Sequence, residues 1–270
     1  MTIAVIISTY NNPSWLRKTL WGYVYQTRPA DEIIIADDGS TSDTEKLVQT
    51  FCNDLPLKHV WHEDKGFRKT KILNEAIKIA TSDYLIFTDQ DCIPRFDFIA
   101  THERFAESGK FLSGGYVKLP MLLSQKLDER DIRSRNAFRL SWLRENGCKM
   151  TFKYTKLVQN IFFTTLMNHV TPTHATWNGM NSSGWRKDII EVNGFDERMA
   201  YGGEDRELGE RLYNAGIRPR QIRYSAIALH LDHQRPYINQ RAWDKNNMIR
   251  KETRRNNLIK TAFGLKKYTL

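Results

Sequence analysis

The segment YLIFTDQD, residues 84–91, decides the fold, because an apolar run leads into Thr88 and then into two carboxylates, Asp89 and Asp91. Such a run is typical of a β-strand that is covered on both faces. Residues i and i+2 of an extended chain point to one side, so both carboxylates face the same space. Like charges so close favour a cation between them, and Mg²⁺ or Mn²⁺ suits oxygen ligands. A turn with two solvated aspartates is the alternative.

Upstream of this segment, strand-like and helix-like patterns alternate. Residues 3–7 and 33–35 are uninterrupted β-branched or apolar runs, and Pro13 opens a stretch with helical spacing. Two sets of apolar residues mark helix faces: Leu16, Leu20 and Val24, then Ile72, Leu73, Ala76, Ile77 and Ala80. This alternation predicts βαβ units, and therefore an α/β fold with a mixed, mostly parallel sheet that binds ligands at the carboxyl ends of its strands.

Polar residues gather at those expected strand ends. Ser8, Thr9 and Tyr10 follow the first strand, and Asp37 and Asp38 follow the second. The run at 37–40 is either a tight turn that starts a helix or a carboxylate site for a base N–H or a ribose hydroxyl. A helix is expected from residue 42, with a possible capping box three residues on, at residue 45.

The second half of the chain is less regular. Residues 118–173 are basic and partly helical, over 127–142, and regular structure resumes near Trp177. Residues 224–229 are expected to form a last strand that delivers His230 and His233. We therefore expect one domain over 1–235, with halves 1–117 and 174–235 around the insertion 118–173, followed by a basic tail at 236–270.

Two further groups are candidates for chemistry. Glu204 and Asp205 follow Gly202 and Gly203 at an expected helix start, where acidic residues commonly complement the helix dipole. The functional interpretation is that the glycines bring the backbone close to a substrate and one carboxylate takes a proton from a hydroxyl. His230 and His233 are either ordinary histidines or metal ligands at a strand end.

The composition describes a globular protein. The 270 residues are 40% hydrophobic and 27% charged, and no apolar run approaches the length of a membrane span. The first ten residues lack the basic start and cleavage site of a signal peptide, so we interpret them as a strand. Three dispersed cysteines favour free thiols over a disulfide framework or a zinc site, which fits a cytoplasmic location.

The net charge of +10 is concentrated near the C-terminus. Residues 241–270 hold nine Lys and Arg against two acidic residues, interleaved with apolar side chains. A helix lying on an anionic membrane surface is one interpretation, and a solvated, partly frayed helix is the other. No nucleic-acid recognition motif accompanies the charge, so nucleic acid is not expected as a partner.

Together, these motifs resemble the family-2-type glycosyltransferases with the GT-A fold. The motifs are Ser8-Thr9-Tyr10-Asn11, Ala36-Asp37-Asp38-Gly39-Ser40-Thr41, Gly66-Phe67-Arg68 with Lys71 and Asn74-Glu75-Ala76, and Asp89-Gln90-Asp91. The later stretches at 193–197 and 201–216 are similar to the acceptor-side motif shared by β1,4-galactosyltransferases and the bacterial chondroitin polymerase. Tyr201 stands where related motifs often carry Trp. The resemblance covers roughly residues 2–117 and 174–235.

The resemblance implies a role for each matching residue. The donor site for a UDP-sugar would comprise Ser8, Thr9, Tyr10, Asp38, Arg68, Lys71 and Asp89. The Mn²⁺ or Mg²⁺ ligands would be Asp91, with Asp89, and His230 or, second, His233. Asp205 would be the catalytic base, with Glu204 holding the acceptor.

The implied activity is inverting transfer of a sugar to a hydroxyl of a glycan or lipid-linked acceptor, in bacterial surface polysaccharide or lipopolysaccharide synthesis. The enzyme would be cytoplasmic, with a peripheral position on the inner face of the membrane as the expectation from its basic tail. A sugar-nucleotide nucleotidyltransferase is an alternative, although no Gly-rich, basic phosphate loop follows the first strand. A non-catalytic carbohydrate- or nucleic-acid-binding module is another, but it leaves the acidic pairs without a joint purpose.

Overall fold

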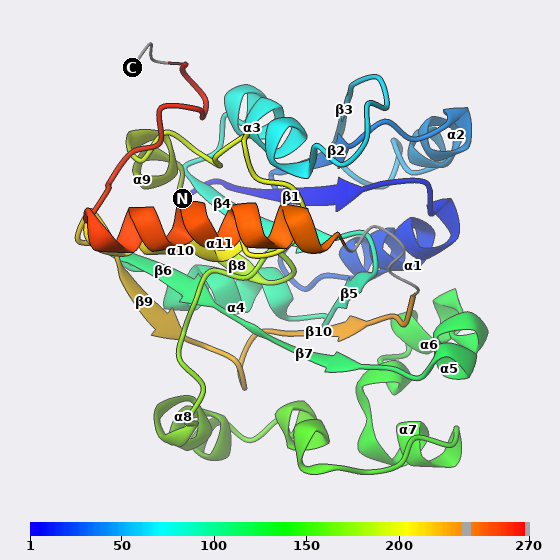
Figure 1. Ribbon diagram of the computed structural model, residues 1–270. Helices are drawn as coiled ribbons and strands as arrows, with labels where there is room; N and C mark the ends of the chain where they lie inside the picture. The colour runs from blue at the N-terminus through cyan, green and yellow to red at the C-terminus, as the bar shows by residue number, and fades with distance from the viewer. Residues whose placement is uncertain (234–238, 268–270) are drawn as a thin grey trace.

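The computed structural model of the chain describes residues 1–233 and 239–267 and shows a seven-stranded sheet between helices (Figure 1). The strand order is β3-β2-β1-β4-β8-β6-β9. These strands are β1 (Ile3–Thr9), β2 (Glu32–Asp37), β3 (Leu57–Trp61), β4 (Tyr84–Asp89), β6 (Lys110–Ser113), β8 (Ser182–Trp185) and β9 (Arg218–Gln221). Four of the six strand pairs are parallel, and only β8 runs against its neighbours. The predicted mixed, mostly parallel α/β sheet is confirmed. The boundary expected at residue 235 lies outside the described residues.

The three strands predicted in the first half are present and buried. β1 and β2 are buried along their whole length, and β4 is buried except at its last residue. Sequence reasoning missed β3, whose residues are exposed or half-buried because it is an edge strand. Its pattern carries little apolar signal, and Pro56 and the polar turn before it look like a loop.

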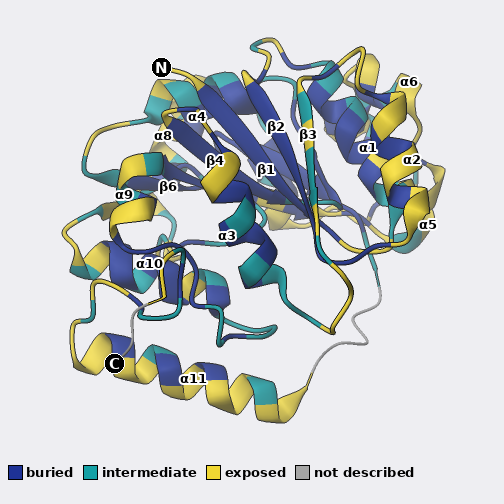
Figure 2. Cartoon of the chain, turned by 90° about the horizontal axis from the view of Figure 1, so that it is seen from above, coloured by how far each residue is buried: buried dark blue, intermediate teal, exposed yellow. Residues whose placement is uncertain are grey.

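Helices cover both faces of this sheet (Figure 2). They are α1 (Pro13–Val24), α2 (Ser42–Thr50), α3 (Lys69–Ile79), α4 (Phe98–Phe105), α9 (Arg186–Glu191) and α10 (Glu204–Asn214). Asn12 caps α1 by accepting a hydrogen bond from the Trp15 amide. The capping box expected between Ser42 and Glu45 is not formed, since Thr41 is the N-cap residue of α2 and makes no side-chain cap.

A second sheet of three strands, β5 (Cys92–Pro94), β10 (Ile227–His230) and β7 (Gly115–Lys118), adjoins the main one. The last strand is shorter than the expected 224–229, because the amides of Ser225 and Ala226 both donate to the Ile222 carbonyl in a turn. β10 pairs with β5 so that His230 lies opposite Cys92. The strand end therefore brings His230 next to the Asp91 that follows β4.

Residues 118–173 form a helical layer on this small sheet. Its elements are α5 (Met121–Lys126), α6 (Glu129–Arg133), η1 (Asn136–Phe138), α7 (Leu140–Glu145), η2 (Phe152–Leu157) and α8 (Ile161–Val170). Leu123, Phe138, Leu143 and Leu157 are buried together with Leu229 of β10. The predicted partly helical insertion thus has an apolar core shared with the strand that carries His230.

The basic C-terminal segment is packed against the domain. Helix α11 (Gln240–Arg255) lies on α10, where it buries Asn246, Ile249 and Thr253, and Arg250 pairs with Glu210 at 2.6 Å (Figure 1). None of the described helices is long and apolar enough to cross a bilayer.

Candidate active site

Strand register gathers polar side chains at one edge of the main sheet. Ser8 of β1 lies opposite Asp89 of β4, and Thr9 lies opposite Asp37 of β2. The Ser8 hydroxyl donates to Asp89 at 2.6 Å, and the Thr9 hydroxyl donates to the side chain of Gln90 at 2.5 Å. The carboxyl ends of three neighbouring strands therefore share one polar edge, as the parallel arrangement requires.

The two aspartates after β2 have different surroundings. Asp37 is fully buried, accepts the Ser40 amide at 2.8 Å and pairs with His59 at 2.9 Å, so it shapes the turn. Asp38 accepts the backbone amide of Arg68 at 2.9 Å and pairs with His62 at 2.7 Å. Burial raises the pKa of Asp38, against the hydrogen bond from His62. Asp38 thereby connects β2 to the start of α3.

Lys69, the first residue of α3, links the strand ends to the second acidic pair. Its ammonium lies 2.7 Å from Asp89. Burial disfavours the charged form of Lys69, but attraction from Asp89, Asp205 and Glu204 outweighs it and raises the pKa of Lys69 well above its ordinary value. The charge of Lys69 thus links Asp89 to an acidic pair that lies more than 100 residues later in the sequence. Sequence reasoning missed Lys69, which stands between the two basic residues that it selected.

Glu204 and Asp205 occupy the first turn of α10, behind two glycines in left-handed conformations, with φ of 112° at Gly202 and 89° at Gly203. This tight bend lets Glu204 accept the Gly202 amide at 2.7 Å. Burial, and then repulsion from Asp205, raise the pKa of Glu204 to about 7. A carboxyl group tuned to neutral pH is matched to proton transfer.

Asp205 is half-buried and incompletely bonded. Burial raises its pKa, while attraction to Lys69 lowers it. Its Oδ1 atom is shielded from solvent and has no hydrogen-bond partner among residues 1–233 and 239–267. Gly179 lies so close that a Cβ on it would meet Asp205 Oδ2 at 2.6 Å, so the backbone there leaves room for nothing larger. A buried carboxylate oxygen without a donor calls for an explanation, and a ligand hydroxyl is one group that could satisfy it.

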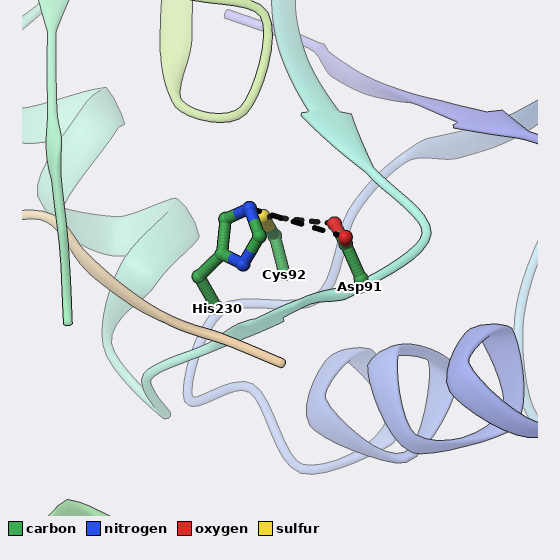
Figure 3. A group of neighbouring side chains, drawn as sticks. All are labelled: Asp91, Cys92 and His230. Carbon is green, nitrogen blue, oxygen red and sulfur yellow. Dashed lines mark hydrogen bonds and ion pairs between the residues drawn. The ribbon is translucent and has the colours of Figure 1, made fainter. Parts of the chain in front are cut away.

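Asp91, Cys92 and His230 form a buried group where β10 meets β5 (Figure 3). His233 Nε2 lies 2.9 Å from Asp91 Oδ2, and His230 Nε2 lies 3.9 Å from the same oxygen. The two imidazole rings are stacked, with centroids 5.6 Å apart. Burial alone would raise the pKa of Asp91, but the hydrogen bond from His233 and the nearby His230 lower it, so the carboxylate is ionised.

The donor atoms of this group fit a divalent metal. The Nδ1 atom of His230 lies 2.7 Å from the Leu231 carbonyl, which only accepts, so Nδ1 carries the proton. In the neutral ring, Nε2 then presents its lone pair on the side of Asp91, which is the tautomer that metal-binding histidines use. Burial raises the pKa of the Cys92 thiol well above its ordinary value, so a neutral Cys92 fills space beside the site.

Not every residue predicted to bind the UDP-sugar points into this site. The Arg68 guanidinium donates to the Glu63 carbonyl. The Lys71 amide donates to the Arg68 carbonyl at 2.9 Å, which is a contact of the backbone alone. Tyr10 is 45% exposed and its hydroxyl donates to Asp64 at 2.9 Å. Among the predicted residues, Ser8, Asp89, Glu204 and Asp205 meet around Lys69, and Asp91 meets both histidines.

The chain belongs to glycosyl transferase family 2, since the sequence model of that family matches residues 4–169. A second model, described as the N-terminal domain of galactosyltransferase, matches residues 167–234. The pair of matches divides near the end of the insertion, so the strand-end acids lie in the first and Glu204, Asp205 and His230 lie in the second. Membership of this family favours a glycosyltransferase over the nucleotidyltransferase and the binding module that the sequence left as alternatives.

Two curated relatives illustrate the family. Validoxylamine A glucosyltransferase of Streptomyces hygroscopicus subsp. limoneus is 29% identical over 87% of this chain and 52% of its own length. The chondroitin synthase of Escherichia coli is 28% identical over 84% of this chain and 34% of its own length. The chain therefore spans about half of the first relative and a third of the second.

Solved structures share the fold, which is GT-A. The mannosyltransferase PcManGT from Pyrobaculum calidifontis, in complex with GDP-Man and Mn²⁺, has a TM-score of 0.58 at 22% identity over 87% of this chain and 58% of that one. S. aureus TarS in complex with UDP-GlcNAc has a TM-score of 0.61 at 17% identity, covering 88% and 60% of the two chains. At these identities, the likeness concerns the backbone alone.

Proposed function

We propose that this family 2 enzyme is a metal-dependent, inverting glycosyltransferase that moves a hexosyl or N-acetylhexosaminyl group from a UDP-sugar to a hydroxyl of a glycan or lipid-linked acceptor. The observation that carries the proposal is the buried ammonium of Lys69, which pairs with Asp89 at 2.7 Å and is also attracted electrostatically by Glu204 and Asp205. This contact makes one site from the donor-side strand ends and the acceptor-side helix.

The donor would bind at the strand ends. Asp38 is the residue for a base N–H or ribose hydroxyl, because its carboxylate already accepts hydrogen bonds and is held rigidly by His62 and the Arg68 amide. Ser8, Thr9 and Tyr10 complete the nucleotide side of the edge. TarS, a structural neighbour, was solved with UDP-GlcNAc, which supports a UDP-sugar as the donor class.

The metal, Mn²⁺ or Mg²⁺, would be held by Asp91 together with His230 or His233. When bound, it supplies Lewis-acid stabilisation for the negative charge on a diphosphate leaving group. Support for this proposal comes from the ionised, buried Asp91, the fixed tautomer of His230 and the Mn²⁺ in the PcManGT complex. Asp89, bonded to Ser8 and Lys69, is the residue for the ribose side.

Asp205 would act as the base. The attacking hydroxyl donates its proton to the carboxylate while its oxygen bonds to the anomeric carbon, and the bond from that carbon to UDP breaks on the opposite face. A single displacement inverts the configuration, so an α-linked donor gives a β-linked product. The unpartnered Oδ1 of Asp205 is the acceptor atom for the proton, and Glu204 orients the acceptor sugar.

The acceptor class follows from the setting of such enzymes and is part of the proposal. A bacterial surface polysaccharide or lipopolysaccharide intermediate would place the enzyme at the inner face of the membrane. By composition alone, the basic residues of 241–270 are one candidate for that contact. The docked helix α11 shows that this segment also packs on the domain, since Asn246 donates to the carbonyls of Ala200 and Gly202 beside the catalytic pair.

The proposal is tested by offering a panel of UDP-sugars with Mn²⁺, and measuring thermal stabilisation together with the slow release of UDP. A ligand that binds only the folded state raises the melting temperature, and UDP release reports donor cleavage. One or more UDP-sugars should do both, and EDTA should abolish both. Stabilisation by none of the panel, or metal-independent release, would refute the proposed donor or the proposed metal dependence.

A further inference from the structure

Helix α8 exposes several large apolar side chains although it packs on the protein. Its buried side chains include Thr164 and Asn168, whereas Phe162, Leu166 and Val170 are 83%, 58% and 58% exposed. At 100° per residue, these three residues lie within 80° of one another on the outward face, and Ile161, also exposed, extends it. A surface helix ordinarily turns its apolar stripe inward. Helix α8 leaves a large part of its apolar surface exposed, while Phe163 and Met167 are half-buried.

The orientation of α8 is fixed by its polar face. Asn168 donates to the Ser225 hydroxyl at 2.8 Å and accepts the Tyr224 amide at 2.8 Å, and the rings of Phe163 and Tyr224 meet edge to face. The inward side of α8 is therefore hydrogen-bonded to the turn that leads into β10. A rotation of the helix that buried Phe162 would break both hydrogen bonds, so the outward apolar face is a property of the sequence in this fold.

The preceding segment adds positive charge to the same layer. Phe152, which is 69% exposed, stands beside Lys153, and Met150 stands beside Lys149, with all four side chains exposed. No Asp or Glu occurs from residue 146 to residue 185. Exposed apolar side chains interleaved with lysines, without acidic residues, match the boundary of an anionic bilayer, where apolar groups enter the acyl region and ammonium groups meet the headgroups.

We propose that the α8 face, defined as Met150, Phe152, Ile161, Phe162, Leu166 and Val170 with Lys149 and Lys153, docks on an anionic lipid bilayer. Figure 1 places α7 and α8 along one edge of the molecule, beyond the small sheet and apart from α11. The insertion therefore makes the contact with the bilayer, whereas the inward face of α11 packs on α10. A protein partner or a second copy would have to supply acidic groups to match the lysines.

The docked face is coupled to the active site through short contacts. Lys156 of η2 donates to the Tyr116 carbonyl at 2.9 Å, and the Tyr116 ring lies 5.7 Å from that of His230. The turn that anchors α8 continues directly into β10, which ends at His230. Docking of the α8 face thus fixes the distance between the bilayer surface and the active site. That suits an acceptor carried on a lipid.

The test is flotation of the full chain with vesicles of phosphatidylcholine containing 30 mol% phosphatidylglycerol. The wild type should float with these vesicles and not with pure phosphatidylcholine. Phe162→Ser combined with Leu166→Ser should lower the partition coefficient by about tenfold or more, and Lys149→Glu with Lys153→Glu should do the same. Met248→Ser, which removes an exposed apolar side chain from α11, is the matched control and should bind normally.

A gain of signal makes the test independent of lost binding. Trp placed by Phe162→Trp should be quenched by brominated lipid, and Trp placed by Met248→Trp should not. Melting curves and UDP release should be unchanged, because none of these residues touches the site. The proposal is overturned if the wild type binds neither vesicle type, or if the variant with Phe162→Ser and Leu166→Ser floats normally. It is also overturned if that variant only dissociates a dimer seen by sedimentation, because a second copy then covers the face.

Discussion

The acidic residues at the strand ends and those at the start of α10 differ in their hydrogen-bond and ion-pair partners. Asp37, Asp38 and Asp91 each have a histidine within hydrogen-bond distance, and Asp89 has Lys69. Glu204 and Asp205 lie beside each other, Lys69 acts electrostatically on both, and Asp205 Oδ1 has no hydrogen-bond partner in the part of the chain that the structure describes. The first group is held by partners from other elements, and the second keeps a carboxylate oxygen that a proton could reach once substrate binds.

This difference follows from the backbone. Strand ends in register place carboxylates within reach of side chains from neighbouring strands and from the loop after β3, so partners are available. The first turn of α10 follows two glycines with positive φ and has Gly179 packed against Asp205, so fewer side-chain partners reach these carboxylates. Removing a partner from the first group and removing a carboxylate from the second should therefore have different consequences.

The largest effect is expected for Asp205→Asn. Loss of a general base costs about 10²–10⁴-fold in rate, so transfer should collapse while the melting shift caused by UDP and Mn²⁺ is retained. Glu210→Gln is the control on the same helix, because Glu210 pairs with Arg250 outside the site. Turnover of Asp205→Asn within a few-fold of wild type would remove the distinction between the two acidic groups.

Asp91→Ala should act on binding rather than on proton transfer. We expect Mn²⁺-dependent affinity for UDP, measured by calorimetry, to fall by about 100-fold or more, since losing even an outer-shell partner costs 10–100-fold. Asp232→Asn is the control, as Asp232 lies between the two histidines in sequence and pairs with Lys118. Unchanged metal-dependent binding would exclude Asp91 as a ligand.

Lys69→Gln tests the cation that the two groups share. Lys69 lowers the pKa values of Glu204 and Asp205, so its loss should raise both. The acidic limb of the profile of kcat/KM against pH should then move to higher pH, with about a tenfold loss at pH 7 that is partly recovered at pH 8.5. Lys78→Gln, on the same helix and paired with Glu75, should leave the profile in place. An unshifted limb would contradict the coupling.

The smallest effect concerns stability at a carboxylate outside the site. Burial would raise the pKa of Glu32, but hydrogen bonds from Lys58, Ser82 and Thr81 lower it to about 2. Because the folded pKa lies below the ordinary value of 4.5, this stabilisation is complete above pH 4.5 and is lost as the pH falls toward 2.

Glu32→Gln should accordingly lower the free energy of unfolding by about 1–3 kcal/mol at pH 7. Urea unfolding at pH 7, 5 and 4 measures the difference from wild type, which should begin to shrink at the lowest pH. UDP release at pH 7 should be unaffected. A constant difference across the pH range would show that the charge of Glu32 contributes nothing.

The sequence predicts the donor half better than the rest, and the reason is periodicity. The runs at 3–7, 33–35 and 84–87 are buried on both faces, so their composition alone identifies them, and order along the chain then places Asp38 and Asp89 at one edge. The sequence did not indicate Lys69, because its role depends on α10, which begins 135 residues later in the chain. Local sequence carries no sign of such a contact.

Two other features depend on tertiary packing in the same way. The segment 241–267 has the composition of a free basic tail, yet Asn246 and Thr253 are buried against the loop and helix that carry Glu204. In 118–173, the apolar residues of α8 look like a core helix by composition, and only the structure shows that they face outward. Polar anchors such as Asn168 decide the orientation, and periodicity does not reveal them.

A crystal structure of the enzyme with UDP and Mn²⁺ tests the central claim most directly, namely that the strand-end and helix-start acids form one active site. The metal should be bound to Asp91 and to His230 or His233, with the base or ribose of UDP on Asp38 and the free carboxylate oxygen of Asp205 facing the space beyond the diphosphate. UDP bound away from Asp91, or a diphosphate separated from Asp205 by protein, would contradict it.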